Sequence, residues 1–126
     1  ELWDEVALAA SKPDVTAPWL PNVLRRILES YFSTLGGFTN LYKIGEHLSG
    51  EEYILHRALI DWAHSGSHTV IDSDDYVQPG VSNKRWLEAF ERVFKGNSGT
   101  HTEHYEMMMQ EAQNHLKASS EETNRQ

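Results

Sequence analysis

The spacing of apolar residues predicts helices along most of the chain. Apolar side chains recur three and four positions apart, which places them on one face of a helix. The pattern predicts a short helix over residues 1–10 and a longer one over residues 22–35, with Asn22 as its N-cap and two glycines after it. Three prolines within residues 12–21 block helix formation and predict an extended connector between the two.

The same spacing predicts three more helices in the rest of the chain. Residues 49–64 open with a Ser-Gly-Glu-Glu capping box, in which a hydroxyl and a carboxylate bond the free N–H groups of a helix start. Residues 82–95, capped by Ser82 or Asn83, carry the next apolar stripe. Residues 104–117 carry the last one.

We therefore expect an all-α fold, an irregular bundle of about four main helices with a long polar loop at residues 65–81. The sequence divides into an N-terminal helix and Pro-rich connector (1–21), a helical domain (22–117) and a polar tail (118–126). No apolar run approaches the roughly 18 residues of a membrane span, so we expect no membrane partner.

The composition excludes several classes of protein. The chain has 126 residues, which suits a single domain. It has no cysteine, which excludes a disulfide framework, a thiolate zinc site and a thiol nucleophile. It has no GxxxxGK[ST] loop, so these residues alone do not form a P-loop ATPase. The first residue is Glu rather than Met, so we expect a piece of a longer protein.

The net charge of −8 argues against nucleic-acid binding, because phosphate groups attract positive charge. The distribution of the charge changes this interpretation. Residues 1–21 carry four acids and one base, residues 96–126 carry five acids and two bases, and residues 22–95 carry ten acids and eight bases. The acidity lies largely in the two ends, so the nearly neutral middle can still meet RNA.

Arg57, Asp61 and His64 are spaced four and three apart, so they project from one edge of the 49–64 helix. Such spacing is usually just a solvated polar face. A guanidinium, however, clamps a phosphate with two hydrogen bonds, and an imidazole moves a proton near pH 7. Together these groups can cleave RNA without a metal, because one removes the 2′-OH proton and the other stabilises charge at phosphorus.

Arg25 and Glu29 lie one turn apart on the 22–35 helix, and the plain interpretation is a surface ion pair. Two pairs of histidines offer a metal site as an alternative. Neither the pair at 64 and 68 nor the pair at 101 and 104 has a carboxylate and third imidazole at a firm spacing, so we expect no metal. The corresponding enzyme, a metal-dependent phosphoesterase, would use the ligands His64, His68, Asp72 and Asp61.

Three segments resemble a known family in the same order. Residues 21–29 (PNVLRRILE) resemble its PN-x-x-R-x-x-x-E segment, and residues 56–65 resemble its R-x2-3-N-x2-SHS segment. Residues 90–109, which end in HTEHYEMMM, resemble its closing VF…IF…H-x-x-HY-x-MMM segment. The chain thus resembles the C-terminal domain of SMC/ABC-like bacterial ATPases of the RloC/PrrC anticodon-nuclease family, and its R-x6-H spacing resembles the HEPN class of all-helical ribonucleases.

The resemblance implies a metal-independent endoribonuclease that cuts tRNA in the anticodon loop. It implies a catalytic set of Arg25, Glu29, Arg57 and His64. Ala63 stands before His64 where the family has Ser, whereas Ser67 precedes His68, so His68 is the alternative histidine. Further possible contributors are Arg26 and Asp61.

The resemblance also implies partners for the chain. We expect RNA as substrate, an ATPase region on the same or a partner chain that binds ATP, no cofactor in these residues, and a homodimer as a possible assembly. The setting would be cytoplasmic antiphage defence. The alternative is a non-catalytic helical module that docks an ATPase, a toxin or a sensor, which the net charge, the acidic loop and the methionines at 107–109 favour.

Overall fold

The computed structural model describes residues 2–34, 42–64, 80–96 and 99–124, and the side chains of residues 62–64, 99–100 and 121–124 lie outside this description. In this part of the chain the fold is all-α, as predicted. The elements are α1 (Leu2–Ala10), α2 (Leu20–Thr34), the 3-10 turn η1 (Lys43–Gly45), α3 (Gly50–His64), α5 (Asn83–Lys95) and α6 (Gly99–Asn124). The predicted polar loop falls almost wholly on residues 65–79, outside the described residues.

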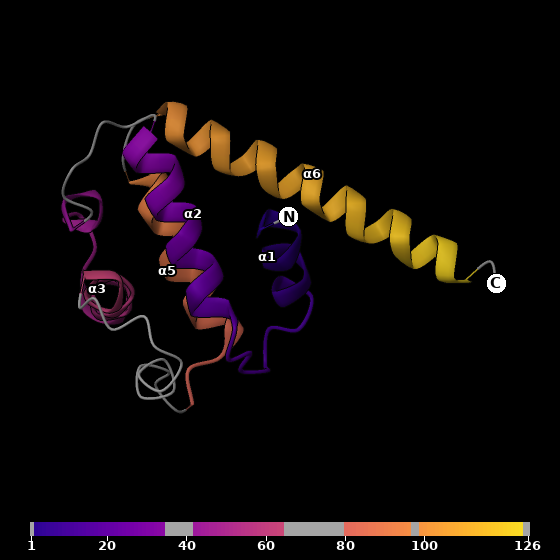
Figure 1. Cartoon of the computed structure of the whole chain (residues 1–126), viewed down its shortest axis with the longest axis horizontal. Coiled ribbons are helices and arrows are strands. Elements are labelled where there is room, and N and C mark those ends of the chain that lie inside the picture. The colour runs from indigo at the N-terminus through magenta and orange to yellow at the C-terminus, as the bar shows by residue number, and fades with distance from the viewer. Residues whose placement is uncertain (1, 35–41, 65–79, 97–98, 125–126) are drawn as a thin grey trace.

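The helices surround a central pair. In Figure 1, α2 and α5 lie side by side, α3 lies on one side of them and α1 on the other. Helix α6 crosses the C-terminal end of α2, packs along α1 and continues beyond the bundle (Figure 1). No helix in the described residues has both the length and the apolar character needed to cross a bilayer.

The core forms around the predicted apolar stripe of α5. Its buried side chains meet aromatic rings from other helices, with Trp3 5.5 Å from Phe90 and Phe32 5.2 Å from Phe94 between ring centroids. The apolar spacing predicts Trp86, Leu87, Phe90, Val93 and Phe94; all of these are buried except Leu87, which is half-buried, and Ala89 is buried as well. Because aromatic side chains bury the largest areas, this cluster joins α1, α2 and α5 into one core.

Helix α2 begins at Leu20, two residues before the predicted N-cap. Pro21 fits in the first turn because a helix start has no partner for an N–H group, which proline lacks. Leu20 is fully buried, so packing fixes the start of the helix. Asn22 uses its side-chain oxygen to accept a hydrogen bond from Arg25 instead of capping the helix.

Helix α3 does not bury the whole face that its apolar spacing predicts, which includes Ile54, Leu55 and Leu59. Leu55 and Leu59 of the predicted stripe are buried, but Ile54 is 57% exposed. His56 and Ile60 are buried in its place. The reason is that α3 packs against α5, α2 and η1 together, so its buried surface spans more than one narrow stripe.

Asn83 ties the start of α5 to the connector between α1 and α2. Ser82 is the N-cap, with its hydroxyl 3.3 Å from the N–H of Arg85. Asn83 is buried, accepts a bond from the N–H of Ala17 at 2.9 Å, and donates to the carbonyls of Lys12 at 3.0 Å and Ala9 at 3.3 Å. Asn83, the alternative N-cap in the sequence analysis, therefore does not cap α5. It acts instead as a buried brace, a side chain that hydrogen-bonds the start of α5 to the connector.

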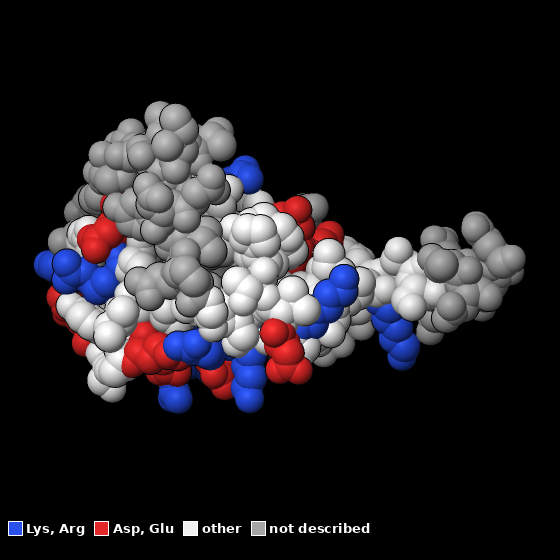
Figure 2. Space-filling model, turned by 90° about the horizontal axis from the view of Figure 1, so that it is seen from below, with Lys and Arg blue, Asp and Glu red and all other residues white. Residues whose placement is uncertain are grey.

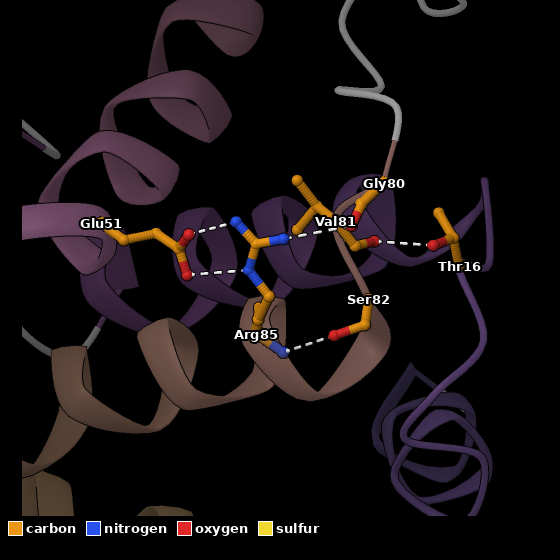
Figure 3. Close-up of polar contacts among 6 residues, drawn as sticks. All are labelled: Thr16, Glu51, Gly80, Val81, Ser82 and Arg85. Atoms are coloured by element: carbon orange, nitrogen blue, oxygen red, sulfur yellow. Dashed lines mark hydrogen bonds and ion pairs between the residues drawn. The ribbon is translucent and has the colours of Figure 1, made fainter.

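Ion pairs join α3 to α5 at the surface. The guanidinium of Arg85 bonds both carboxylate oxygens of Glu51, with 2.9 Å between Nε and Oε1 (Figure 3). It also donates to the carbonyl of Gly80 at 3.1 Å, while Thr16 donates to the carbonyl of Val81 (Figure 3). These bonds attach the segment before α5 to α3 and to the connector.

Helix α6 extends past both predicted ends, since it runs to residue 124 and includes much of the predicted polar tail. Tyr105 and Ala112 bury its inner face, and Asp4 of α1 lies 3.0 Å from Nδ1 of His115. The contact of His101 with Tyr31 accounts for helix before residue 104, and the packing against α1 continues to Leu116, which still contacts the core.

Candidate functional site

Arg57 lies in a cluster of polar and aromatic side chains on the outer face of α3. Its Nη1 atom donates to the hydroxyl of Tyr53 at 3.0 Å, and its guanidinium carbon is 4.7 Å from the centre of the Tyr42 ring. Asp61 accepts a hydrogen bond from the hydroxyl of Tyr42 at 2.6 Å and stands 4.0 Å from Nη2 of Arg57. Together they form what we call the α3 cluster: Tyr42, Tyr53, Arg57 and Asp61.

The α3 cluster holds its guanidinium in a fixed position without burying it. The side chain of Arg57 is 46% exposed, and that of Asp61 is 47% exposed. The bond to Tyr53 raises the pKa of Arg57, and Asp61 and Tyr42 raise it further, so the side chain remains a cation. A groove of about 300 Å³, also lined by Ile54, opens beside it. An oxyanion such as a phosphate can therefore reach the guanidinium.

Arg25 and Glu29 form the ion pair that their spacing predicts, on α2. Asn22 also accepts a bond from the guanidinium of Arg25. The side chain of Arg25 is only 11% exposed, while the neighbouring Arg26 is exposed. This pair is thus held more firmly than a surface pair, with the carboxylate of Glu29 fixing the direction of the guanidinium.

Four of the predicted site residues form two pairs, each within one helix. Arg57 meets Asp61 on α3, and Arg25 meets Glu29 on α2, which packs against α3. His64 is the last residue of α3, seven positions after Arg57, and its side chain lies outside the description. The alternative His68 lies outside the described residues altogether.

The α3 cluster includes two tyrosines, Tyr42 and Tyr53, that the sequence analysis did not predict as site residues. Tyr53 stands four residues before Arg57, and this helical spacing could have identified it. Tyr42 is 19 residues from Asp61, its hydrogen-bond partner. No local pattern could have placed it there, because its position depends on how η1 packs against α3.

His101 and His104, considered as metal ligands from the sequence, contact aromatic rings. Nδ1 of His101 lies 2.7 Å from the hydroxyl of Tyr31, and the ring of His104 stacks on Tyr31 at 4.1 Å between centroids. Burial lowers the pKa of His104, and His101 lowers it further. Within the described ranges, no three His, Cys, Asp or Glu side chains are grouped closely enough to hold a metal ion.

The surface charges are mixed. On the face shown in Figure 2, basic and acidic side chains alternate over the described residues instead of forming one broad basic area. Several are paired with one another, as Arg92 is with Glu52 at 3.5 Å. A nucleic acid would therefore meet a few local cations rather than a large positive surface.

Comparison with known proteins gives one match. A family model described as an AAA domain (AAA_13) matches residues 1–95, which is 95 of the 126 residues and includes α1 to α5. No curated protein and no solved structure matches the chain. The match covers every predicted site residue from Arg25 to His68 and ends where α5 ends. The chain therefore belongs to this family of AAA domains, and it is an ATPase-associated helical domain.

Proposed function

We propose that this chain is a metal-independent endoribonuclease domain that acts under the control of an ATPase region. The observation that carries the proposal is the α3 cluster, in which an exposed guanidinium is held by Tyr53, Tyr42 and Asp61. His64 follows two helical turns after Arg57 on the same helix. An anion-binding group and an acid–base group on one helix are the minimum that this chemistry requires.

The proposed reaction transfers the phosphate within the RNA strand. The 2′-oxygen attacks phosphorus while His64 takes its proton, the bond to the 5′-oxygen breaks, and a proton from water passes to that oxygen as it leaves. The products are a 2′,3′-cyclic phosphate and a 5′-hydroxyl. Arg57 would stabilise the charge on the phosphate oxygens. The rings of Tyr42 and Tyr53 offer apolar surface beside it, which suits unpaired RNA bases.

Arg25 and Glu29 would support the same reaction from α2. Glu29 fixes the direction of the Arg25 guanidinium, which we propose as a second phosphate contact. The resemblance to anticodon nucleases makes tRNA the proposed substrate, and it places ATP binding on a separate ATPase region. A homodimer, a cytoplasmic location and a role in antiphage defence are further parts of the proposal.

Cleavage of bulk tRNA by histidine variants tests the function. His64→Ala should abolish the appearance of 2′,3′-cyclic phosphate ends, with an unchanged helical CD spectrum. His68→Ala should retain cleavage, and His47→Ala is the matched control, because His47 is exposed and lies before α3. Full cleavage by both the His64 and the His68 variant would refute the proposed role of this histidine pair.

A second candidate function is a non-catalytic module that docks an ATPase, toxin or sensor. Tyr53 and Ile54 favour it, because both apolar side chains are exposed on the outer face of α3. Capture of a stoichiometric protein partner that is lost in Ile54→Asp would support docking. Cyclic phosphate ends produced by the wild-type chain alone would count against it.

A further inference from the structure

A groove between α1, α2 and α6 lies apart from the α3 cluster. The groove is open to solvent and has a volume of about 600 Å³, within the range of roughly 300 to 1,000 Å³ typical of small-molecule sites. In Figure 1, α6 begins beside the C-terminal end of α2 and passes the start of α1 farther along its length. The apolar wall of the groove includes Trp3, Ile27 and Met108.

The polar groups of the groove are few and uncharged. Ser30 and Thr34 contribute hydroxyls from the exposed side of α2, and His104 contributes an imidazole from α6. No Lys, Arg, Asp or Glu occurs among the described residues that line it. Transfer of a charged group into such surroundings is unfavourable without a partner, so the lining favours a neutral ligand.

His104 is held in a fixed orientation at this groove. Its ring lies nearly parallel to that of Tyr31, with 19° between the planes, and meets Trp3 edge-on at 6.1 Å. Burial and the nearby His101 both lower the pKa of His104. A neutral imidazole offers one hydrogen-bond donor and one acceptor, which matches the edge of a heteroaromatic ring.

We propose that this groove binds a neutral planar heteroaromatic ring, a nucleobase carried by a nucleoside. The ring would contact Trp3, Ile27 and Met108 through its apolar surface and bond His104 through its polar edge. Such contacts combine an apolar wall with a few directed polar groups, as small-molecule sites do. A phosphate would gain nothing in the groove, because its lining has no cation. The inference does not depend on the proposed nuclease activity.

Titration of the full chain with adenosine tests the proposal, followed by NMR signals of the methionine methyl groups and histidine rings. The signals of Met108 and His104 should shift on addition of adenosine, while ribose alone should shift neither. An RNA of five adenosines should bind no more tightly than adenosine. Met108→Trp, which fills the groove, should weaken adenosine binding at least tenfold. Met107→Trp is the matched control, because Met107 is 57% exposed and does not line the groove.

Each of three results would overturn the proposal. The first is the absence of any shift at millimolar adenosine in the folded wild-type chain. The second is equal loss of binding in the Met107 and Met108 variants, which would place the ligand elsewhere. The third is binding by the RNA alone, which would assign the base contact to an RNA strand instead of a small ligand. His104→Phe, which keeps a ring on Tyr31, should also reduce adenosine binding, and unchanged binding would refute the role of the imidazole.

Discussion

The imidazole of His56 lies directly against the backbone of Gly45, so that a Cβ added to Gly45 would stand 2.3 Å from Cδ2 of the ring. Both residues are buried, His56 on α3 and Gly45 at the end of η1. This contact lets η1 approach α3 closely, and η1 in turn carries Tyr42, which precedes it, toward Asp61. The position of Tyr42 in the α3 cluster therefore depends on Gly45, which is not itself a member of the cluster.

Gly45→Ala should destabilise the domain by about 2 kcal/mol, because a buried ring cannot move aside without shifting the backbone around it. The free energy of unfolding in urea measures the effect. Gly96→Ala is the matched control: its Cβ would stand 1.9 Å from Cδ2 of His47, but His47 is exposed and can turn away. That variant should lose only the bond from His47 to the carbonyl of Arg92. Equal losses in the two variants would contradict the argument.

Asn83→Ala should lower the free energy of unfolding by about 3 kcal/mol, because it removes three side-chain hydrogen bonds to the backbone, two of them buried and one part-buried. Denaturant unfolding of the variant provides the measurement. The matched control is Asn114→Ala, because Asn114 lies on the exposed face of α6. A change of similar size in both variants would mean that Asn83 is not a brace.

The Glu51–Arg85 pair predicts a dependence of stability on pH. The hydrogen bond from Arg85 lowers the pKa of Glu51 below its ordinary value of 4.5. A lowered pKa stabilises the folded state above the unfolded pKa, and this contribution is lost as the pH falls through the folded pKa. Glu51→Gln should therefore lower the melting temperature at pH 7 and show a smaller further decline below pH 4.5 than wild type. Glu103→Gln, an exposed carboxylate on α6, should follow the wild-type curve.

Tyr53→Phe tests the contribution of the Tyr53 hydroxyl to the α3 cluster separately from that of the Tyr53 ring. The variant loses the bond to Arg57 but keeps the aromatic ring, so the rate of RNA cleavage should fall only a few-fold. Arg57→Ala should reduce that rate on the order of a hundredfold, because the guanidinium itself is lost. Rates on the same tRNA, with CD as a check of folding, provide the comparison. Arg92→Ala, an exposed arginine of α5, is the control. If it reduced cleavage as much as Arg57→Ala, general positive charge rather than the α3 cluster would explain the effect.

Local sequence accounts for the number of long helices and for the side-chain contacts within a single helix. Most of the apolar stripe of α5 and the contact of Arg25 with Glu29 follow from the 3.6-residue period, which is a property of the chain alone. The spacing likewise placed Arg57 beside Asp61 on α3. These features were predictable because they require only neighbours within one helix.

The face that each helix buries, and the residues that it contacts on other helices, depend on tertiary packing. It turned His56 inward and Ile54 outward, brought Tyr42 to Asp61, and placed Tyr31 beside His101 across 70 residues. It also made Asn83 a brace instead of a cap. Such contacts depend on the packing of several helices at once, in which buried area and hydrogen bonds outweigh the preference of any single segment.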